Sequence, residues 1–336
     1  MNPASRRPGV VAIILNYRNW PDTLRCLESV YRLDYPRLRV IVVENGSDDD
    51  SLDRIRAWAA GEQPAPDVAA HPLRAHLDPP VPKPLSVAVV PAGAAEAPDD
   101  GRDLRRLLTI VRSDENRGFS GGNNLGIRLA AARANWGYLW LLNNDTVVPP
   151  DALDALVRTA EGDPGLGLVG SRLLDMTPPH AVQALGGRIQ PLTGASRHLR
   201  DERELPTLNY IVGASMLISR ACLERVGPLD EDFFLYAEDS DYSLRVRRKG
   251  LRIGVALDSR VYHTEGGTSA GPAQDYYGIR NSLYLNRRHF PGRWPVTGMW
   301  IALRIAKRLA PGRWTGLRAA LQGWRDYRAG RMGKRT

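Results

Sequence analysis

Two apolar segments decide the fold: Val10-Val11-Ala12-Ile13-Ile14-Leu15, and Leu38-Arg39-Val40-Ile41-Val42-Val43 after it. Nearly continuous apolar runs rich in Val and Ile are typical of strands buried on both faces of a parallel sheet. Between them, residues 21–33 place apolar side chains at helical spacing, and residues 47–50 supply acids for the first turn of another helix. This strand–helix–strand–helix order predicts an α/β fold with a parallel sheet.

The alternation continues along the chain. We expect further strands at residues 107–111 and 138–142, and a glycine-opened helix at 118–135. Residues 61–106 are rich in Pro, Ala and Asp and contain one strand-like piece, so we interpret them as an insertion or mobile loop. We therefore divide the chain into an α/β domain at residues 1–270 and a helical C-terminal region at 271–336.

Composition excludes several protein classes. The 336 residues contain two cysteines, Cys26 and Cys222, which makes a disulfide framework or a zinc cluster a poor interpretation. Both lie among apolar residues, so we expect packed thiols in a reducing, cytoplasmic compartment. No convincing signal peptide and no apolar run of the ~20 residues that a membrane helix needs can be found.

The net charge of +9 is concentrated in the tail. Residues 287–336 hold 13 Lys or Arg against one acid, Asp326, so the tail carries +12 and the remainder −3. Tryptophans are interleaved with these charges, and residues 299–309 have the pattern of an interfacial amphipathic helix. Three interpretations stay open: an anionic membrane surface on the inner face of the plasma membrane, a solvated face packed on its own domain, and nucleic acid. We favour the first and expect no nucleic acid.

Two acidic segments suggest one site. Asn143-Asn144-Asp145 follow the predicted strand at 138–142, and ligands bind at the carboxyl ends of strands in open α/β sheets. Asp145 is suited to Mg²⁺ or Mn²⁺, which prefer oxygen ligands, although Asn and Asp are also ordinary turn residues.

The second acidic segment is Glu238-Asp239-Ser240-Asp241. Crowded carboxylates raise at least one pKa, which suits a base that deprotonates a hydroxyl group. Asp241 lies four residues before Arg245 and has the simpler explanation of supporting a helix.

Two further segments carry polar groups that a ligand needs. In Asn116-Arg117-Gly118-Phe119-Ser120-Gly121-Gly122-Asn123-Asn124, glycines ahead of a helix allow backbone N–H groups to approach an anion. An ordinary glycine-rich helix start is the alternative. His263 follows a strand-like segment and offers an imidazole to a metal, although a lone histidine is more often structural.

Taken in order, these segments resemble the inverting glycosyltransferases of family 2, in the branch described as rhamnosyltransferase-like. The resemblance spans most of residues 10–290. It implies a GT-A fold, which is a Rossmann-like, mostly parallel central sheet flanked by helices, here with a basic helical C-terminal extension. It also implies a nucleotide-diphosphate sugar donor and a divalent cation, Mg²⁺ or Mn²⁺. Its motifs are Ile13 to Tyr17, Val42 to Ser47, Asn116 to Asn124, Leu142 to Asp145, Phe233 to Gly250, Tyr262-His263, and Tyr276 to Asn281.

The resemblance also implies residue roles. Asp239 matches the catalytic base, and Asp145 and His263 match the metal ligands. Glu238 and Asp241 would line the acceptor side or support the base. The donor-binding residues would be Asn16, Tyr17, Glu44, Asn45, Asn116, Gly118, Gly121, Gly122, Asn123 and Asn144.

The chain departs from the commonest family pattern at two positions. Asn143 stands where the metal motif usually begins with an acid, and Glu44 stands where an aspartate usually contacts the nucleoside. The first departure places metal binding on Asp145 and His263, and both leave the nucleotide base of the donor open.

The resemblance implies transfer of a sugar to a saccharide or lipid-linked saccharide in cell-surface polysaccharide assembly. Rhamnose or another deoxyhexose is a candidate for the sugar. Two alternatives are a non-catalytic nucleotide-sugar-binding partner of an assembly complex and a sugar-nucleotide pyrophosphorylase. The pyrophosphorylase would need a glycine-rich, basic loop after the first strand, which Asn16-Tyr17-Arg18-Asn19 does not provide.

Overall fold

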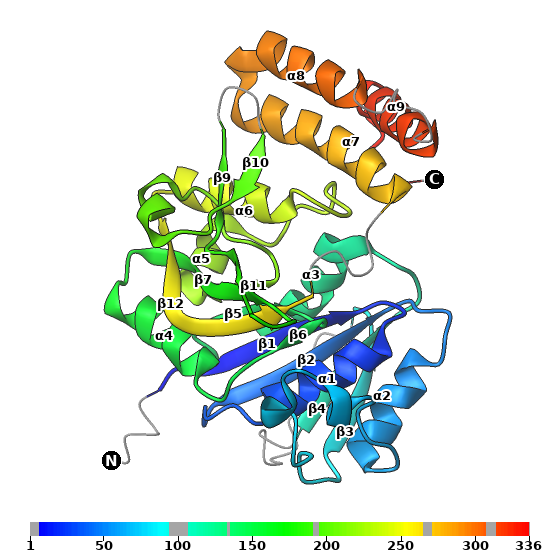
Figure 1. The fold of residues 1–336 in the computed structure, drawn as a ribbon, viewed down its shortest axis with the longest axis vertical. Coiled ribbons are helices and arrows are strands. Elements are labelled where there is room, and N and C mark those ends of the chain that lie inside the picture. The colour runs from blue at the N-terminus through cyan, green and yellow to red at the C-terminus, as the bar shows by residue number, and fades with distance from the viewer. Residues whose placement is uncertain are drawn as a thin grey trace.

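A large central sheet organises the molecule. The computed structural model describes residues 7–93, 107–132, 135–190, 195–264, 271–306 and 314–335. Within these ranges ten strands form one sheet in the order β3-β4-β2-β1-β5-β11-β7-β12-β6, with β8 paired to β7 (Figure 1). The strands are β1 (Val10–Asn16), β2 (Leu38–Asn45), β3 (Ser86–Pro91), β4 (Leu107–Ser113), β5 (Tyr138–Asn143), β6 (Thr146–Val147), β7 (Leu166–Asp175), β8 (Val182–Ala184), β11 (Ser215–Ser219) and β12 (Arg252–His263). A separate antiparallel pair is formed by β9 (Gly187–Ile189) and β10 (Ser196–His198).

The five strands from β3 to β5 are parallel, as the apolar runs predicted. β11 enters antiparallel between β5 and β7, and β12 runs parallel to β7. Helices cover both faces. The helices on one face are α1 (Trp20–Val30), α2 (Ser51–Ala60) and α4 (Ala152–Gly162), and those on the other are α3 (Gly118–Ala131), α5 (Arg220–Val226) and α6 (Glu238–Arg248).

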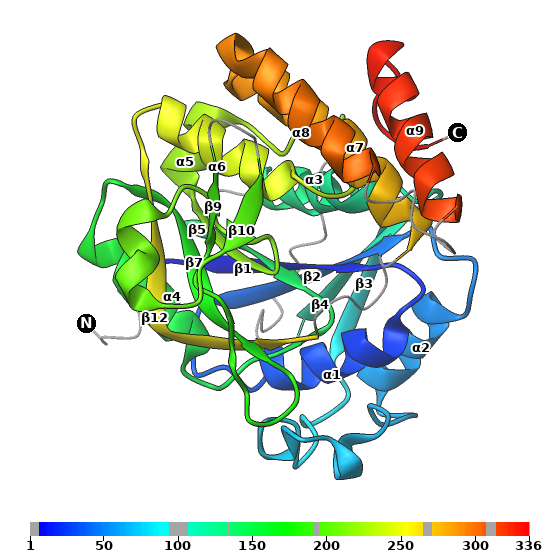
Figure 2. The ribbon, with the colours of Figure 1, turned by 45° about the horizontal axis from the view of Figure 1, so that its top comes forward.

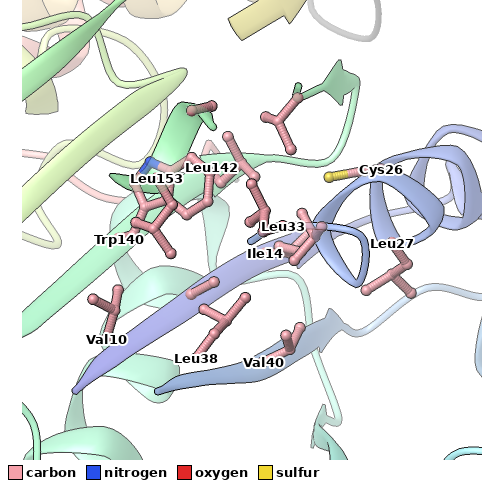
Figure 3. Packing of buried hydrophobic residues seen from close by; sticks show 14 of the residues in the cluster. Val10, Ile14, Cys26, Leu27, Leu33, Leu38, Val40, Trp140, Leu142 and Leu153 are labelled. Carbon is pink, nitrogen blue, oxygen red and sulfur yellow. The ribbon is translucent and has the colours of Figure 1, made fainter. Parts of the chain in front are cut away.

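Strand β1 shows why both faces are covered. Val10 and Ile14 belong to the cluster under α1 and α4, whereas Val11 and Ile13 belong to the cluster under α3. In Figure 3, Ile14 lies near Leu27 of α1, with Trp140 of β5 and Leu153 of α4 in the same cluster. Each fully buried side chain of this size contributes about 1.5–3 kcal/mol, which explains why β1 is apolar from Val10 to Leu15 and polar only at its last residue, Asn16.

Residues 61–93, the described part of the expected insertion, pack on the domain. They contain the 3-10 turns η2 (Val68–Ala70) and η3 (Arg74–His76) and then β3, which forms one edge of the sheet. Lys83 donates to the buried carboxylate of Glu28 on α1 over 2.7 Å, which ties the segment to the core. Residues 94–106 lie outside the described residues, so the mobile-loop hypothesis stays a prediction.

The C-terminal region is helical, as expected. Its helices are α7 (Pro272–His289), α8 (Trp294–Ala306) and α9 (Trp314–Arg328), with the 3-10 turn η6 (Pro291–Arg293) between α7 and α8. Another 3-10 turn, η5 (Glu202–Thr207), belongs to the α/β domain. α7 to α9 lie together beyond the α6 side of the domain (Figures 1 and 2) and pack through apolar side chains that include Ile279, Leu283 and Ile301. Of the helices in the described ranges, none combines the length and apolar character needed to cross a bilayer. Residues 307–309 of the expected amphipathic helix lie outside the described residues.

Candidate active site

The carboxyl ends of three neighbouring strands bring the predicted polar residues to one edge. Asn16 at the end of β1 is in register with Glu44 of β2, and Leu15 is in register with Asn143 of β5. Asn144 and Asp145 follow immediately in the turn to β6. The predicted polar residues therefore lie together at the ends of parallel strands, and ligand binding at this edge stays a prediction.

Most asparagines at this edge are already bonded within the protein. Asn45 is buried, its Nδ2 donates to Asn116 Oδ1 and to the carbonyl oxygen of Gly118, and its Oδ1 accepts from the N–H of Arg117. Asn123 donates to the carbonyl oxygen of Phe119 over 2.9 Å. These side chains shape the segment that opens α3, so a contact with a nucleotide-sugar ligand would have to compete with hydrogen bonds inside the protein.

The end of β1 is braced in a similar way. Asn144 Nδ2 donates to Thr23 Oγ1 over 2.9 Å and to the carbonyl oxygen of Asn19, and Thr23 in turn donates to Asn16 Oδ1 over 2.8 Å. The Nδ2 of Asn16 is buried and has no hydrogen-bond partner in the described part of the chain. Of these groups, the Asn16 amide is therefore the one whose N–H groups are left to donate a hydrogen bond to a ligand.

Glu44 and Tyr17 lie beside this rim. The Glu44 side chain is buried and its Oε1 accepts from the N–H of Ser47 over 3.0 Å. Tyr17 is half-buried under the guanidinium of Arg18, whose carbon lies 5.2 Å from the ring centre. An aromatic face and a carboxylate at the end of β2 are groups that a nucleoside can use.

The glycine segment is explained by close packing. Gly118 has φ of +69°, and a Cβ there would overlap the carbonyl oxygen of Phe234. That same oxygen accepts from the N–H of Phe119 over 2.7 Å, and Asn116 Oδ1 accepts from the N–H of Gly118. Gly121 and Gly122 are buried against neighbouring side chains. Since the first two N–H groups of α3 have protein partners, diphosphate binding by this segment stays a prediction.

Asp145 and His263 meet as expected. His263 ends β12, next to β6, and its Nε2 lies 3.4 Å from Asp145 Oδ1 and 3.4 Å from Asn143 Nδ2. Asp145 Oδ1 is buried without a hydrogen-bond partner in the described residues. A buried carboxylate oxygen without a partner is costly unless a ligand or cation satisfies it.

The residues present fit a divalent cation that is shared with a ligand. No cluster of three or more His, Cys, Asp or Glu side chains surrounds one point in the described ranges. Mg²⁺ and related ions are often held by one or two protein ligands while substrate phosphates and water complete the shell. Asp145 and His263 would supply the protein part of such a shell.

Asp239 lies in the first turn of α6, which begins at Glu238. Its Oδ1 accepts from the N–H of Ser240 over 2.6 Å and its Oδ2 from the N–H of Gly213 over 3.2 Å. Burial raises the pKa of Asp239, and these bonds limit the rise. The carboxylate is thus fixed in direction and has raised basicity.

Glu238 strengthens this effect. Its side chain is 7% exposed and its Oε2 has no hydrogen-bond partner in the part of the chain described. Burial, together with the negative charge of Asp239, raises the pKa of Glu238 well above its ordinary value. The repulsion between two desolvated carboxylates raises their basicity and makes an environment suited to proton transfer.

Asp241, two residues further on, has a different environment. It is fully buried, and it accepts from Arg245 Nε and from His289 Nε2 over 2.7 Å each. Burial opposes ionisation, but the bond from His289 and the charges of Arg245 and Arg288 hold the pKa of Asp241 below its ordinary value. Asp241 therefore braces α6 against the end of α7, and its carboxylate does not line an acceptor surface.

The backbone before Asp239 is held in an unusual conformation. Tyr236 and Ala237 both have positive φ, 68° and 71°, which costs free energy for residues with a Cβ. Asn281 of α7 donates to the carbonyl oxygens of Leu235 and Tyr236 over 2.8 Å each. The C-terminal region thus fixes the loop that carries the acids.

One short connection joins the two acidic groups. Just before β11, the N–H of Gly213 donates to Asp239, and the carbonyl oxygen of Ala214 accepts from the N–H of Asn143 over 3.0 Å. The end of β5 and the start of α6 therefore face one another across residues 213 and 214.

Sequence reasoning missed three residues that shape the site: Gly213, Gln183 and the role of Asn281. Gln183 Oε1 lies 2.7 Å from His263 Nδ1. Asn281 belongs to the family motif at residues 276–281, but the sequence did not indicate its role. Gly213 and Gln183 lie in short strands and turns that show no periodic pattern of apolar residues.

Known proteins share this architecture. The family described as Glycosyltransferase like family 2 matches residues 93–275, and the family Glycosyl transferase family 2 matches residues 11–68. A solved structure, the mannosyltransferase PcManGT from Pyrobaculum calidifontis in complex with GDP-Man and Mn²⁺, has a TM-score of 0.53 at 18% identity and covers 98% of this chain and 84% of its own. This likeness supports the expected GT-A fold.

Curated relatives are similar over part of their length. The low-salt glycan biosynthesis hexosyltransferase Agl10 of Haloferax volcanii is 28% identical over 167 residues, 47% of this chain and 52% of the relative. The N-acetylglucosaminyl-diphospho-decaprenol L-rhamnosyltransferase of Mycobacterium tuberculosis is 26% identical over 254 residues, 66% of this chain and 82% of the relative. The chain thus spans about half of the first relative and about four-fifths of the second. The family match over residues 93–275 covers more than half of this chain, so the chain belongs to glycosyltransferase family 2.

Proposed function

We propose that the protein is a metal-dependent, inverting glycosyltransferase. It moves a sugar from a nucleotide diphosphate to a hydroxyl group of a saccharide or lipid-linked saccharide in glycan or cell-surface polysaccharide synthesis. The observation that carries this proposal is that two groups lie on either side of residues 213 and 214. One is the Asp145–His263 pair, in which Asp145 Oδ1 has no hydrogen-bond partner among the described residues, and the other is the desolvated carboxylate of Asp239.

In the proposed reaction each residue has one task. Asp239, oriented by two backbone N–H groups, accepts the proton of the acceptor hydroxyl as its oxygen forms a bond to the anomeric carbon. The bond from that carbon to the diphosphate breaks on the opposite face, which inverts the configuration. Asp145 and His263 would hold Mg²⁺ or Mn²⁺, which when bound neutralises charge on the leaving diphosphate. Rhamnose or another deoxyhexose is the sugar we propose, since two of the similar proteins are named as rhamnosyl transferases.

Nucleotide binding tests this proposal. The thermal stability of the full chain would be measured with UDP, dTDP and GDP, each with and without Mn²⁺ or Mg²⁺. We expect one nucleotide to stabilise the protein only with metal, by about 2.7 kcal/mol at a hundredfold excess over Kd. Asp145→Ala should abolish this gain. Asp53→Asn, at a carboxylate that is 83% exposed on α2, should retain it. Absence of any shift would refute donor binding, and binding without turnover would favour the non-catalytic alternative.

We also propose that the C-terminal helices contact an anionic membrane surface at the cytoplasmic side. Four large hydrophobic side chains are exposed among the described residues. Three of them lie on α8 and α9: Met299 (62%), Leu303 (57%) and Trp314 (59%). Met299 and Leu303 are four residues apart, so they share one face of α8, and residues 287–336 around them carry a net charge of +12, whereas the rest of the chain carries −3. A lipid-linked acceptor would be reached from such a position.

Vesicle sedimentation separates this proposal from a solvated face. The full chain should sediment with vesicles that contain anionic phosphatidylglycerol and less with neutral phosphatidylcholine. The double variant Met299→Ser, Leu303→Ser should lose this binding, whereas Val89→Ser, at the fourth exposed side chain on edge strand β3, should not. Equal sedimentation of all variants, or none, would contradict the membrane proposal.

A further inference from the structure

A buried glutamine contacts the ring of His263 on the side away from Asp145. Gln183 lies in the middle of β8, 2% exposed, and its Oε1 is 2.7 Å from His263 Nδ1. β8 pairs with β7, which in turn pairs with β12, so three strands place these two side chains together.

The surroundings of Gln183 fix the orientation of its amide. Its Nε2 faces two oxygen atoms, Asp175 Oδ1 and the carbonyl oxygen of His263, at 3.4 Å each. Both atoms are acceptors, so the amide nitrogen belongs on that side and the amide oxygen faces the ring. An amide oxygen can only accept, and therefore His263 Nδ1 must carry the proton.

The proton on Nδ1 decides what His263 presents on its other side. In the neutral ring, Nε2 then carries a lone pair, and it faces Asp145 Oδ1 at 3.4 Å. Asn143 Nδ2 also lies 3.4 Å from Nε2 and can donate to it, but the lone pair and the Asp145 oxygen are both acceptors and repel each other unless a cation lies between them. Adjacent ligands of an octahedral ion with bonds of ~2.1 Å are about 3 Å apart, which is close to the observed spacing.

We infer that Gln183 is a positioning residue for the metal site, holding the His263 ring with Nδ1 protonated so that the Nε2 lone pair is directed beside Asp145. Ring N–H groups of metal-bound histidines are commonly held by such acceptors, and removal of the acceptor typically weakens metal binding 10–100-fold. The inference deepens the proposed function and rests on it for the metal. The ring orientation itself can be tested without metal or substrate.

The first test is ¹⁵N NMR of histidine-labelled, metal-free full chain, about two pH units above the ordinary histidine pKa of ~6.5. His263→Asn identifies the signals of His263. We expect a pyrrole-like Nδ1 and a pyridine-like Nε2 in the wild type. Gln183→Leu should lose this preference because it removes the acceptor. Gln183→Glu keeps an oxygen facing Nδ1 and should retain it, which separates positioning from a merely structural role.

The second test measures the affinity of the same proteins for Mn²⁺ alone, from the electron paramagnetic resonance signal of the free ion. We expect Gln183→Leu to bind 10–100-fold more weakly and Gln183→Glu within a few-fold of the wild type. A wild-type His263 that carries its proton on Nε2, or a Gln183→Leu variant with unchanged tautomer, would overturn the inference. The expected tautomer without any Mn²⁺ binding would instead count against the metal in the proposed function.

Discussion

The end of β5 and the first turn of α6 both carry buried acids, yet the two regions treat them differently. At β5, the Oδ1 of Asp145 has no hydrogen-bond partner in the described residues and faces the Nε2 of His263. At α6, Asp239 is held by two backbone N–H groups beside a second carboxylate, and burial raises the pKa of both acids. The first environment favours a cation and the second raises the basicity of its carboxylates, so similar residues are suited to metal binding in one place and to base catalysis in the other.

The largest expected effect separates the base from the metal site. Asp239→Asn keeps the shape of the side chain but removes its basicity, so turnover should fall by about 10²–10⁴-fold. Nucleotide binding with metal should persist because Asp145 and His263 are unchanged. Release of nucleotide diphosphate from the donor identified by the binding panel is the measurement. Near-normal turnover in this variant would remove Asp239 from the role of base.

The next effect distinguishes two acids in the same helical turn. Asp241→Asn leaves Arg245 and His289 without their buried carboxylate, so the free energy of unfolding should fall by about 3 kcal/mol. Asp239→Asn should change it by less than about 1 kcal/mol, because its partners are neutral backbone groups. Urea unfolding of both variants measures the difference. Equal destabilisation would mean that Asp239 is also a structural acid.

A smaller effect depends on pH. The folded-state pKa of Glu238 is raised, so folding loses stability as pH rises from the ordinary glutamate pKa of ~4.3 towards the raised value. Glu238→Gln removes this loss. Its melting temperature should therefore exceed that of the wild type by an amount that is near zero at about pH 4 and grows with pH. A gain that shrinks as pH rises would contradict the raised pKa.

The smallest effect concerns the strained loop. Ala237 has φ of 71°, so Ala237→Gly should stabilise the protein by roughly 0.5–1 kcal/mol by relieving a left-handed conformation. Ala57→Gly in α2 is the matched control and should destabilise it by about 1 kcal/mol. Chemical unfolding of the two variants should give shifts of opposite sign. Destabilisation by Ala237→Gly would show that the Cβ of Ala237 contributes packing that outweighs the strain.

The sequence was sufficient for the parallel half of the sheet, and it predicts a site at the carboxyl ends of these strands. Continuous apolar runs identify β1, β2, β4 and β5 because strands buried on both faces tolerate little polarity, and polar residues just after such runs must lie at the sheet edge. The joint order of motifs also predicted the family correctly.

Side-chain partners could not be predicted in the same way. Asn45 and Asn144 occur at the expected edge, but whether an amide faces a ligand or a backbone carbonyl depends on residues far away in the chain. Asp241 pairs with His289, 48 positions later. Gln183 lies in a three-residue strand, and its contact with His263 joins residues 80 positions apart, so no local periodicity signals it.

The position of the metal tests most directly whether Asp145 and His263 bind the cation while Asp239 serves as the base. Crystals of the full chain grown with Mn²⁺ and the nucleotide diphosphate selected by the binding panel would locate the ion from its anomalous scattering. We expect one peak bound by an Asp145 carboxylate oxygen and His263 Nε2, with Asp239 free of metal. A peak bound between Glu238 and Asp239, with none at Asp145, would contradict it.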